Sequence, residues 1–161
     1  MAARWYAICS KPHKEEVLWR QLHAYGFEVF YPRFIPNTTP LNMLRAKPFF
    51  PGYLFIKTDI ESVGISTFQW MPFAAGLVCF GGKPAYVPDS LIQAIQKRIQ
   101  RINAPLSDIL VGMPHSPQTA HPRTPMAGIQ IILDASIPGR ERVRALLKIL
   151  DEMNISQDES N

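Results

Sequence analysis

The sequence predicts an α+β domain in which helices cover one face of an antiparallel sheet. Short β-rich apolar runs alternate with amphipathic helical patterns, and residues that favour turns separate them. The expected order over residues 1–103 is β-α-β-β-α-β followed by one further helix. This order is the ferredoxin-like plan, an antiparallel sheet with its helices on one side.

Each element of this plan has its own signal. Residues 5–9 form a β-rich apolar run, which predicts a strand. A helix is expected after Pro12, because Leu18, Leu22 and Tyr25 recur on one helical face. Gly26 is expected to end this helix. Further strands are expected at residues 27–34, 52–58 and 77–80, a short helix at 61–70, and a longer helix at 89–102.

The chain changes character after residue 103. Five prolines between residues 104 and 127 indicate a linker. Apolar patterning resumes over residues 128–151, and a polar tail at 152–161 is expected to fray. The sequence leaves open whether residues 128–151 form a β-structure or a helix, because Arg142, Ala145, Leu146 and Ile149 also suit a helix.

Charge and cysteine usage narrow the function classes. Residues 1–103 hold 12 basic against 6 acidic residues, and residues 104–161 hold 5 against 7. This mild excess is far below that of a dedicated nucleic-acid binder. Cys9 and Cys79 lie in apolar runs, which predicts reduced thiols and a cytoplasmic protein. The apolar stretches are too short to cross a bilayer.

The sequence contains no recognisable catalytic or metal-binding constellation. The four histidines are scattered without metal-ligand spacing, and Gly81-Gly82-Lys83 lacks the remaining features of a phosphate-binding loop. We therefore expect neither an enzyme nor a bound cofactor or metal ion.

The most informative segment is the aromatic run at residues 49–55. Phe49, Phe50, Tyr53 and Phe55 fall within seven residues, and alternation places Tyr53 and Phe55 on one face of the sheet. If helices cover only one face, the aromatic face is left open, and soluble proteins rarely expose such a surface without a partner. The segment therefore predicts a docking surface for a helical partner.

Three separated motifs resemble the N-terminal (NGN) domain of the NusG family. They are Trp5-Tyr6-Ala7-Ile8, the run from Phe49 to Phe55, and the segment from Gly76 to Pro88. The resemblance implies a transcription elongation or antitermination factor, which binds the clamp helices of the largest catalytic subunit of RNA polymerase and modulates pausing or termination. A monomer is expected.

The resemblance also implies roles for particular residues. The polymerase-binding residues would be Phe50 and Tyr53, with Phe49 beside them and Tyr6 nearby on the first strand. Specialised members of the family touch the displaced non-template DNA strand, for which Arg45, Lys47, Ser66 and Thr67 are candidates.

The family's second domain is a small KOW β-barrel, and residues 128–150 are similar to its second half only. An incomplete barrel favours a specialised, RfaH-like member, which would house a helical hairpin here, and argues against contacts with Rho or the ribosome. The alternative function is a single-stranded RNA-binding module, because Gly52-Tyr53-Leu54-Phe55-Ile56 partly resembles the aromatic strand of RNA-recognition motifs.

Overall fold

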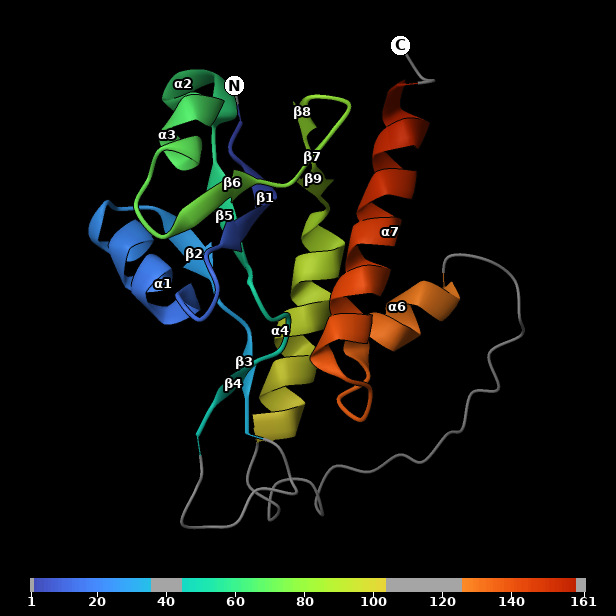
Figure 1. Ribbon diagram of the computed structural model, residues 1–161. Coiled ribbons are helices and arrows are strands. Elements are labelled where there is room, and N and C mark those ends of the chain that lie inside the picture. Colours follow the sequence, from blue (N-terminus) through green and yellow to red (C-terminus); the bar gives the residue numbers. More distant parts are fainter. Residues whose placement is uncertain (1, 36–44, 104–125, 159–161) are drawn as a thin grey trace.

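The computed structural model describes residues 2–35, 45–103 and 126–158. Its main sheet is antiparallel, with the strand order β2-β5-β1-β6. β9 also pairs with β1, and β3 with β4 and β7 with β8 form two small ribbons (Figure 1). The strands are β1 (Arg4–Ser10), β2 (Glu28–Phe30), β3 (Arg33–Phe34), β4 (Lys47–Pro48), β5 (Tyr53–Thr58), β6 (Ala74–Leu77), β7 (Cys79–Phe80), β8 (Lys83–Pro84) and β9 (Tyr86–Val87). The helices are α1 (Glu15–Ala24), α2 (Ile60–Val63), α3 (Ile65–Gln69), α4 (Asp89–Asn103), α6 (Met126–Leu133) and α7 (Gly139–Asp158).

The central strands β1 and β5 have a different hydrophobic cluster on each face. Ala7 lies opposite Phe55, and Ile8 lies opposite Leu54 in the antiparallel register. Because side chains alternate along a strand, Ala7 and Phe55 join one cluster, and Ile8 and Leu54 join the other. The alternation predicted for residues 53–56 is confirmed, and β5 is buried on both sides.

Helices lie on both sides of the sheet, with α1, α2 and α3 on one side and α4, α6 and α7 on the other (Figure 1). The predicted α+β class is confirmed. The expectation of helices on one face is incomplete, because α4 and the C-terminal helices pack on the opposite face from α1, in the cluster that contains Ala7 and Phe55.

Two predicted elements are interrupted where the sequence supplies a breaker. The strand expected at 27–34 is divided into β2 and β3 by Tyr31 and Pro32, since proline has no N–H for a sheet ladder. The helix expected at 61–70 is divided at Gly64, which has a φ of 84°.

The segment after residue 125 is helical. Of the two structures left open for residues 128–151, the KOW-like β-structure is wrong for the described residues, and the helical one is observed as α6 and α7. Helix α7 continues to Asp158, so the tail expected from residue 152 is helical up to that point. Of the predicted linker, residues 126 and 127 belong to α6, and residues 104–125 lie outside the described residues. Residues 36–44 also lie outside the described residues.

Candidate functional site

Five phenylalanines form a continuous chain of ring contacts at the start of β5. Phe34 meets Phe49 with ring centroids 5.3 Å apart, Phe49 meets Phe50 at 5.2 Å, and Phe50 meets Phe55 at 5.9 Å, all close to perpendicular. Phe30 stacks on Phe55 at 5.9 Å. Edge-to-face rings attract one another beyond the area they bury. We call these five residues the aromatic cluster.

Backbone contacts fix the turn that carries the cluster. Gly52 has a φ of 84°, a conformation that glycine adopts without strain, and its N–H donates to the Glu15 carboxylate at 2.9 Å. The Gly52 carbonyl accepts from the Ser10 N–H at 2.8 Å, and the Phe49 N–H donates to the Pro32 carbonyl at 2.9 Å. The positions of Phe50 and Tyr53 are therefore set by both α1 and β1.

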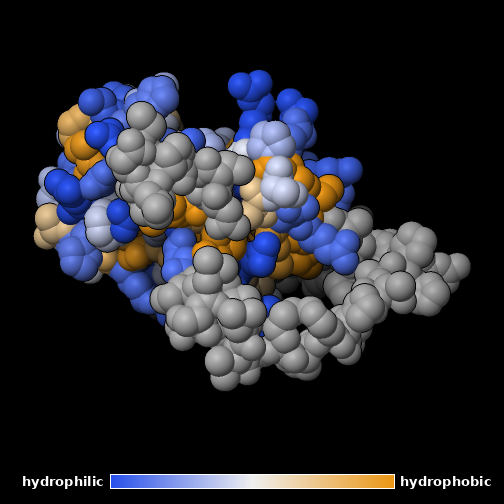
Figure 2. Space-filling view, turned by 90° about the horizontal axis from the view of Figure 1, so that it is seen from below, coloured by the Kyte–Doolittle hydropathy of each residue, from blue (hydrophilic) through white to orange (hydrophobic). Residues whose placement is uncertain are grey.

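Helices from the C-terminal end of the same chain cover the aromatic cluster. Phe49 and Phe50 are 0% exposed, and Tyr53 is half-buried. The expectation that this aromatic face is left open is therefore wrong, because α6 and α7 lie against it. Seen from below, apolar side chains lie in the middle of the molecule, between mainly hydrophilic ones on either side (Figure 2). The residues of α6 and α7 buried in the shared cluster are Ile132, Leu146, Ile149 and Leu150.

Arg142 is a charged residue buried at this interface, where it is 2% exposed. Its Nε donates to the Phe49 carbonyl at 2.9 Å, and Nη1 donates to the carbonyls of Asp134, at 3.2 Å, and Ile137. The guanidinium carbon lies 4.1 Å from the centroid of the Phe49 ring and 5.2 Å from that of Phe34. Backbone carbonyls and π-faces thus replace the water that the cation loses.

Burial lowers the pKa of the Arg142 guanidinium, and the charge of Asp134 opposes this shift. A guanidinium nevertheless stays protonated in proteins. A buried cation held by fixed carbonyls requires one arrangement of its partners, so Arg142 specifies how α7 sits on Phe49.

The structure does not bring all the predicted polymerase-binding residues together. Phe49, Phe50 and Tyr53 pack in one cluster. Tyr6 lies opposite Ile56 across β1 and β5 and packs on the other face of the sheet. Its side chain therefore belongs to a different surface.

The four predicted nucleic-acid contacts fall at two separate places. Arg45 and Lys47 are exposed at the β3–β4 ribbon. Ser66 and Thr67 are exposed on α3, on the far side of the sheet domain from that ribbon (Figure 1).

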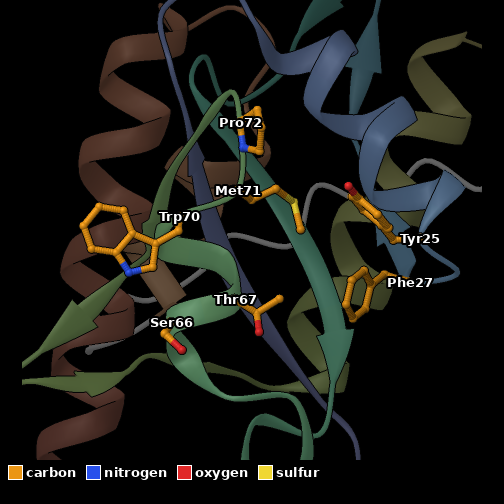
Figure 3. A pocket seen from close by; sticks show the side chains of 7 residues that line it. All are labelled: Tyr25, Phe27, Ser66, Thr67, Trp70, Met71 and Pro72. Atoms are coloured by element: carbon orange, nitrogen blue, oxygen red, sulfur yellow. The ribbon is translucent and has the colours of Figure 1, made fainter.

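Ser66 and Thr67 line a mainly apolar pocket between α3 and the end of α1, with a volume of about 430 Å³. Thr67 and Met71 lie between Trp70 on one side and Tyr25 and Phe27 on the other (Figure 3). Trp70 is 79% exposed and Tyr25 is 65% exposed, which is unusual for such large rings.

Sequence reasoning missed several residues of these surfaces. Arg142 was considered only for helix propensity, and nothing local to it indicates a partner 93 positions away. Phe80 packs against the same cluster as Phe50, and its place in the motif from Gly76 to Pro88 was the available signal. Trp70 was signalled only as a large aromatic residue at the end of a short helix.

Two searches of the described residues bear on other classes of site. No group of three or more histidine, cysteine, aspartate or glutamate residues in the described ranges is arranged to hold a metal ion. None of the helices in those ranges combines the length and the hydropathy that a membrane span needs.

These features define an α+β domain whose aromatic surface is covered by helices of its own chain. A family model described as "Transcription termination factor nusG" matches residues 3–96. The chain therefore belongs to the NusG family, whose members are non-enzymatic transcription factors, and membership supports a role in transcription elongation or termination.

Among solved structures, the one titled "Domain interaction in Thermotoga maritima NusG" is similar, with 23% sequence identity and a TM-score of 0.41. The match covers 59% of this chain and 56% of that one. No curated protein matches the chain.

Proposed function

We propose that this protein is a specialised NusG-family factor that binds the clamp helices of RNA polymerase and modulates pausing or termination. The aromatic cluster is the observation that carries the proposal. It is large and apolar, and helices cover it. It lies at the strand and turn for which the resemblance to the NusG family implies a docking surface. Phe49 and Phe50 of the cluster, with the neighbouring Tyr53, would be the central residues of the docking surface.

The occupant of this surface in the structure supports a helical partner. Helices α6 and α7 place one apolar face against the cluster, which is the packing that a groove for a helix provides. A clamp helix would need the same surface. Polymerase and the C-terminal helices would thus compete, and polymerase would bind only molecules in which α6 and α7 have moved away.

With competition of this kind, the apparent affinity for polymerase equals the affinity of the open form multiplied by the fraction of molecules that are open. The free protein would stay largely closed, and a second event at the polymerase would be needed to open it. This behaviour suits a factor that acts at selected sites.

Replacing Tyr53 with serine is expected to weaken polymerase binding about tenfold or more, because central aromatic residues dominate interfaces. Tyr53 is a cleaner probe than Phe50, whose truncation would also leave a cavity in the core. The measurement is a pull-down of core polymerase with the full chain, with circular dichroism as the check of folding. Val17→Ser, at an exposed position of α1 on the other side of the sheet, is the control; equal loss of binding in the two variants would contradict the assignment.

A second contact follows from the pocket at Ser66 and Thr67. We propose that it receives an unstacked base of the displaced non-template strand, because exposed aromatic rings beside a pocket are suited to stacking on bases. Arg45 and Lys47 lie at the β3–β4 ribbon and do not line this pocket.

Replacing Trp70 with alanine is expected to weaken binding of a short oligothymidine about tenfold, since stacking contributes about 1–3 kcal/mol per base. The measurement is a fluorescence anisotropy titration at fixed salt. Val17→Ala, at an exposed position of α1, should bind as the wild type does. Wild-type affinity in Trp70→Ala would exclude a base at this pocket.

The alternative RNA-binding function finds less support. It too would need the C-terminal helices to move away, because Phe55 of β5 is 0% exposed beneath them. The surface is occupied by helices in the structure, which favours a helical partner over RNA.

A further inference from the structure

A second cavity lies at the seam where the last turns of α7 pass the β7–β9 side of the sheet. Its volume is about 340 Å³, which is within the range of small-ligand sites. Its walls come from both parts of the molecule, so the cavity exists only while α7 is docked. The residues that give the cavity its chemistry are Arg4, Tyr6, Lys83, Tyr86, Asp151 and Asn154.

The sheet side of this seam cavity presents aromatic rings beside a cation. Tyr6 and Tyr86 are direct partners across β1 and β9, which places their side chains next to each other on one face. The guanidinium carbon of Arg4 lies 5.3 Å from the centroid of the Tyr86 ring. Phe80 adds a third ring to the lining. The cavity therefore offers a planar ligand aromatic rings as well as a positive charge.

The charges of the cavity are unevenly placed. Arg4 and Lys83 line it from the strands, whereas Asp151 lines it from α7. Asp59 and Glu61 line a neighbouring cavity that shares Arg4 and Tyr6. Asp59 and Glu61 do not line the seam cavity itself, so Arg4 and Lys83 give its strand side two cations for a phosphate. The α7 side offers a carboxylate and the Asn154 amide to hydroxyl and amino groups.

The position of α7 at the seam is fixed by a direct contact. The Asn154 Oδ1 accepts from the Tyr86 N–H at 3.4 Å, and Nδ2 of the same amide donates to the Leu150 carbonyl at 2.5 Å. The α7 wall of the cavity is thus joined to β9, the strand that carries Tyr86.

We propose that the seam cavity binds a mononucleotide, with the phosphate at Arg4 and Lys83, the base against the tyrosine rings, and the sugar hydroxyls toward Asp151. Because both walls contribute, the bound nucleotide stabilises the closed position of α7. The binding site is independent of polymerase; the consequence that nucleotide reduces polymerase binding rests on the proposed function.

Isothermal titration of the full chain with AMP, GMP, CMP and UMP tests the site. At least one nucleotide is expected to bind and to raise the melting temperature, whereas inorganic phosphate and the matching nucleoside alone bind at least tenfold more weakly. Absence of binding by all four at millimolar concentration would overturn the proposal. Phosphate binding as tight as that of the nucleotide would overturn it too, because the rings would then play no part.

Variants locate the site. Arg4→Gln and Lys83→Gln should each weaken nucleotide binding at least tenfold, and Lys97→Gln, at an exposed position of α4, should not. Unchanged affinity in Lys83→Gln would place the nucleotide elsewhere. A single-stranded oligonucleotide could bind more tightly than its mononucleotide and lose affinity in the same variants. That result would show that the cavity is part of a nucleic-acid-binding surface and not a mononucleotide site.

Hydrogen exchange separates binding from regulation. A saturating nucleotide should slow amide exchange in α7, and unchanged exchange with nucleotide bound would overturn the stabilising role. If the chain fails to bind polymerase at all, the titration and exchange results still stand, so the two proposals can fail separately.

Discussion

Replacing Leu146 with aspartate is expected to raise the affinity for core polymerase by about a hundredfold or more. Leu146 is 0% exposed in the cluster that joins α7 to Phe49 and Phe50. A carboxylate buried there without a partner costs several kcal/mol, and each 1.4 kcal/mol changes an equilibrium about tenfold. The variant should open the C-terminal helices and leave the aromatic cluster available. The measurement is the dissociation constant from surface-immobilised polymerase.

The control is Lys148→Asp, which places the same side chain on the exposed face of α7. It should change polymerase affinity little. An unchanged affinity in Leu146→Asp, with α7 shown to be open by hydrogen exchange, would mean that the covered surface is not the docking surface.

The second large effect is expected from Arg142→Ala. The change leaves the carbonyls of Phe49, Asp134 and Ile137 without their donor and removes the cation from the Phe49 ring. A lost buried hydrogen bond to a charged group costs about 1.5–3 kcal/mol, and the desolvation of the guanidinium offsets part of this cost. We expect the closed form to lose about 2 kcal/mol, so that the open population rises roughly thirtyfold.

Hydrogen exchange of α7 measures this change. Arg144→Ala is the matched control, because Arg144 is exposed on the same helix and pairs with Glu141 at 3.4 Å. Such surface pairs contribute little to stability. Equal exchange rates in Arg142→Ala and the wild type would show that the guanidinium does not hold the helix in place.

The first domain was largely predictable because its signals are local. The alternation of Tyr53, Leu54, Phe55 and Ile56 predicts the face of the sheet on which each side chain packs. The apolar stripe of α4 likewise predicted a helix from Asp89 to about residue 102, and the helix ends at Asn103.

The covering of the aromatic cluster was not predictable in the same way. Ile132 and Leu146 meet Phe49 only through packing between distant parts of the chain, and the local pattern of residues 128–151 suited two structures. The family resemblance drew attention to the surface but could not say what lies on it. Packing between distant parts of the chain decides both the helical structure of residues 128–151 and the identity of the segment that covers the aromatic cluster.

Phe73, between Pro72 and Ala74, adopts a left-handed backbone with a φ of 69°. The Phe73 carbonyl accepts from the Lys11 N–H at 2.8 Å, which helps to hold this turn beside the Trp70 pocket. A left-handed backbone at a bulky residue is strained, and such strain concentrates near functional sites.

The central claim is that the C-terminal helices and polymerase occupy the same surface in turn. Hydrogen exchange with mass spectrometry, on the full chain with and without core polymerase, tests it most directly. Bound polymerase should speed exchange along residues 139–158 while residues 49–55 stay protected. Retained protection of residues 139–158 in the bound complex would contradict the account.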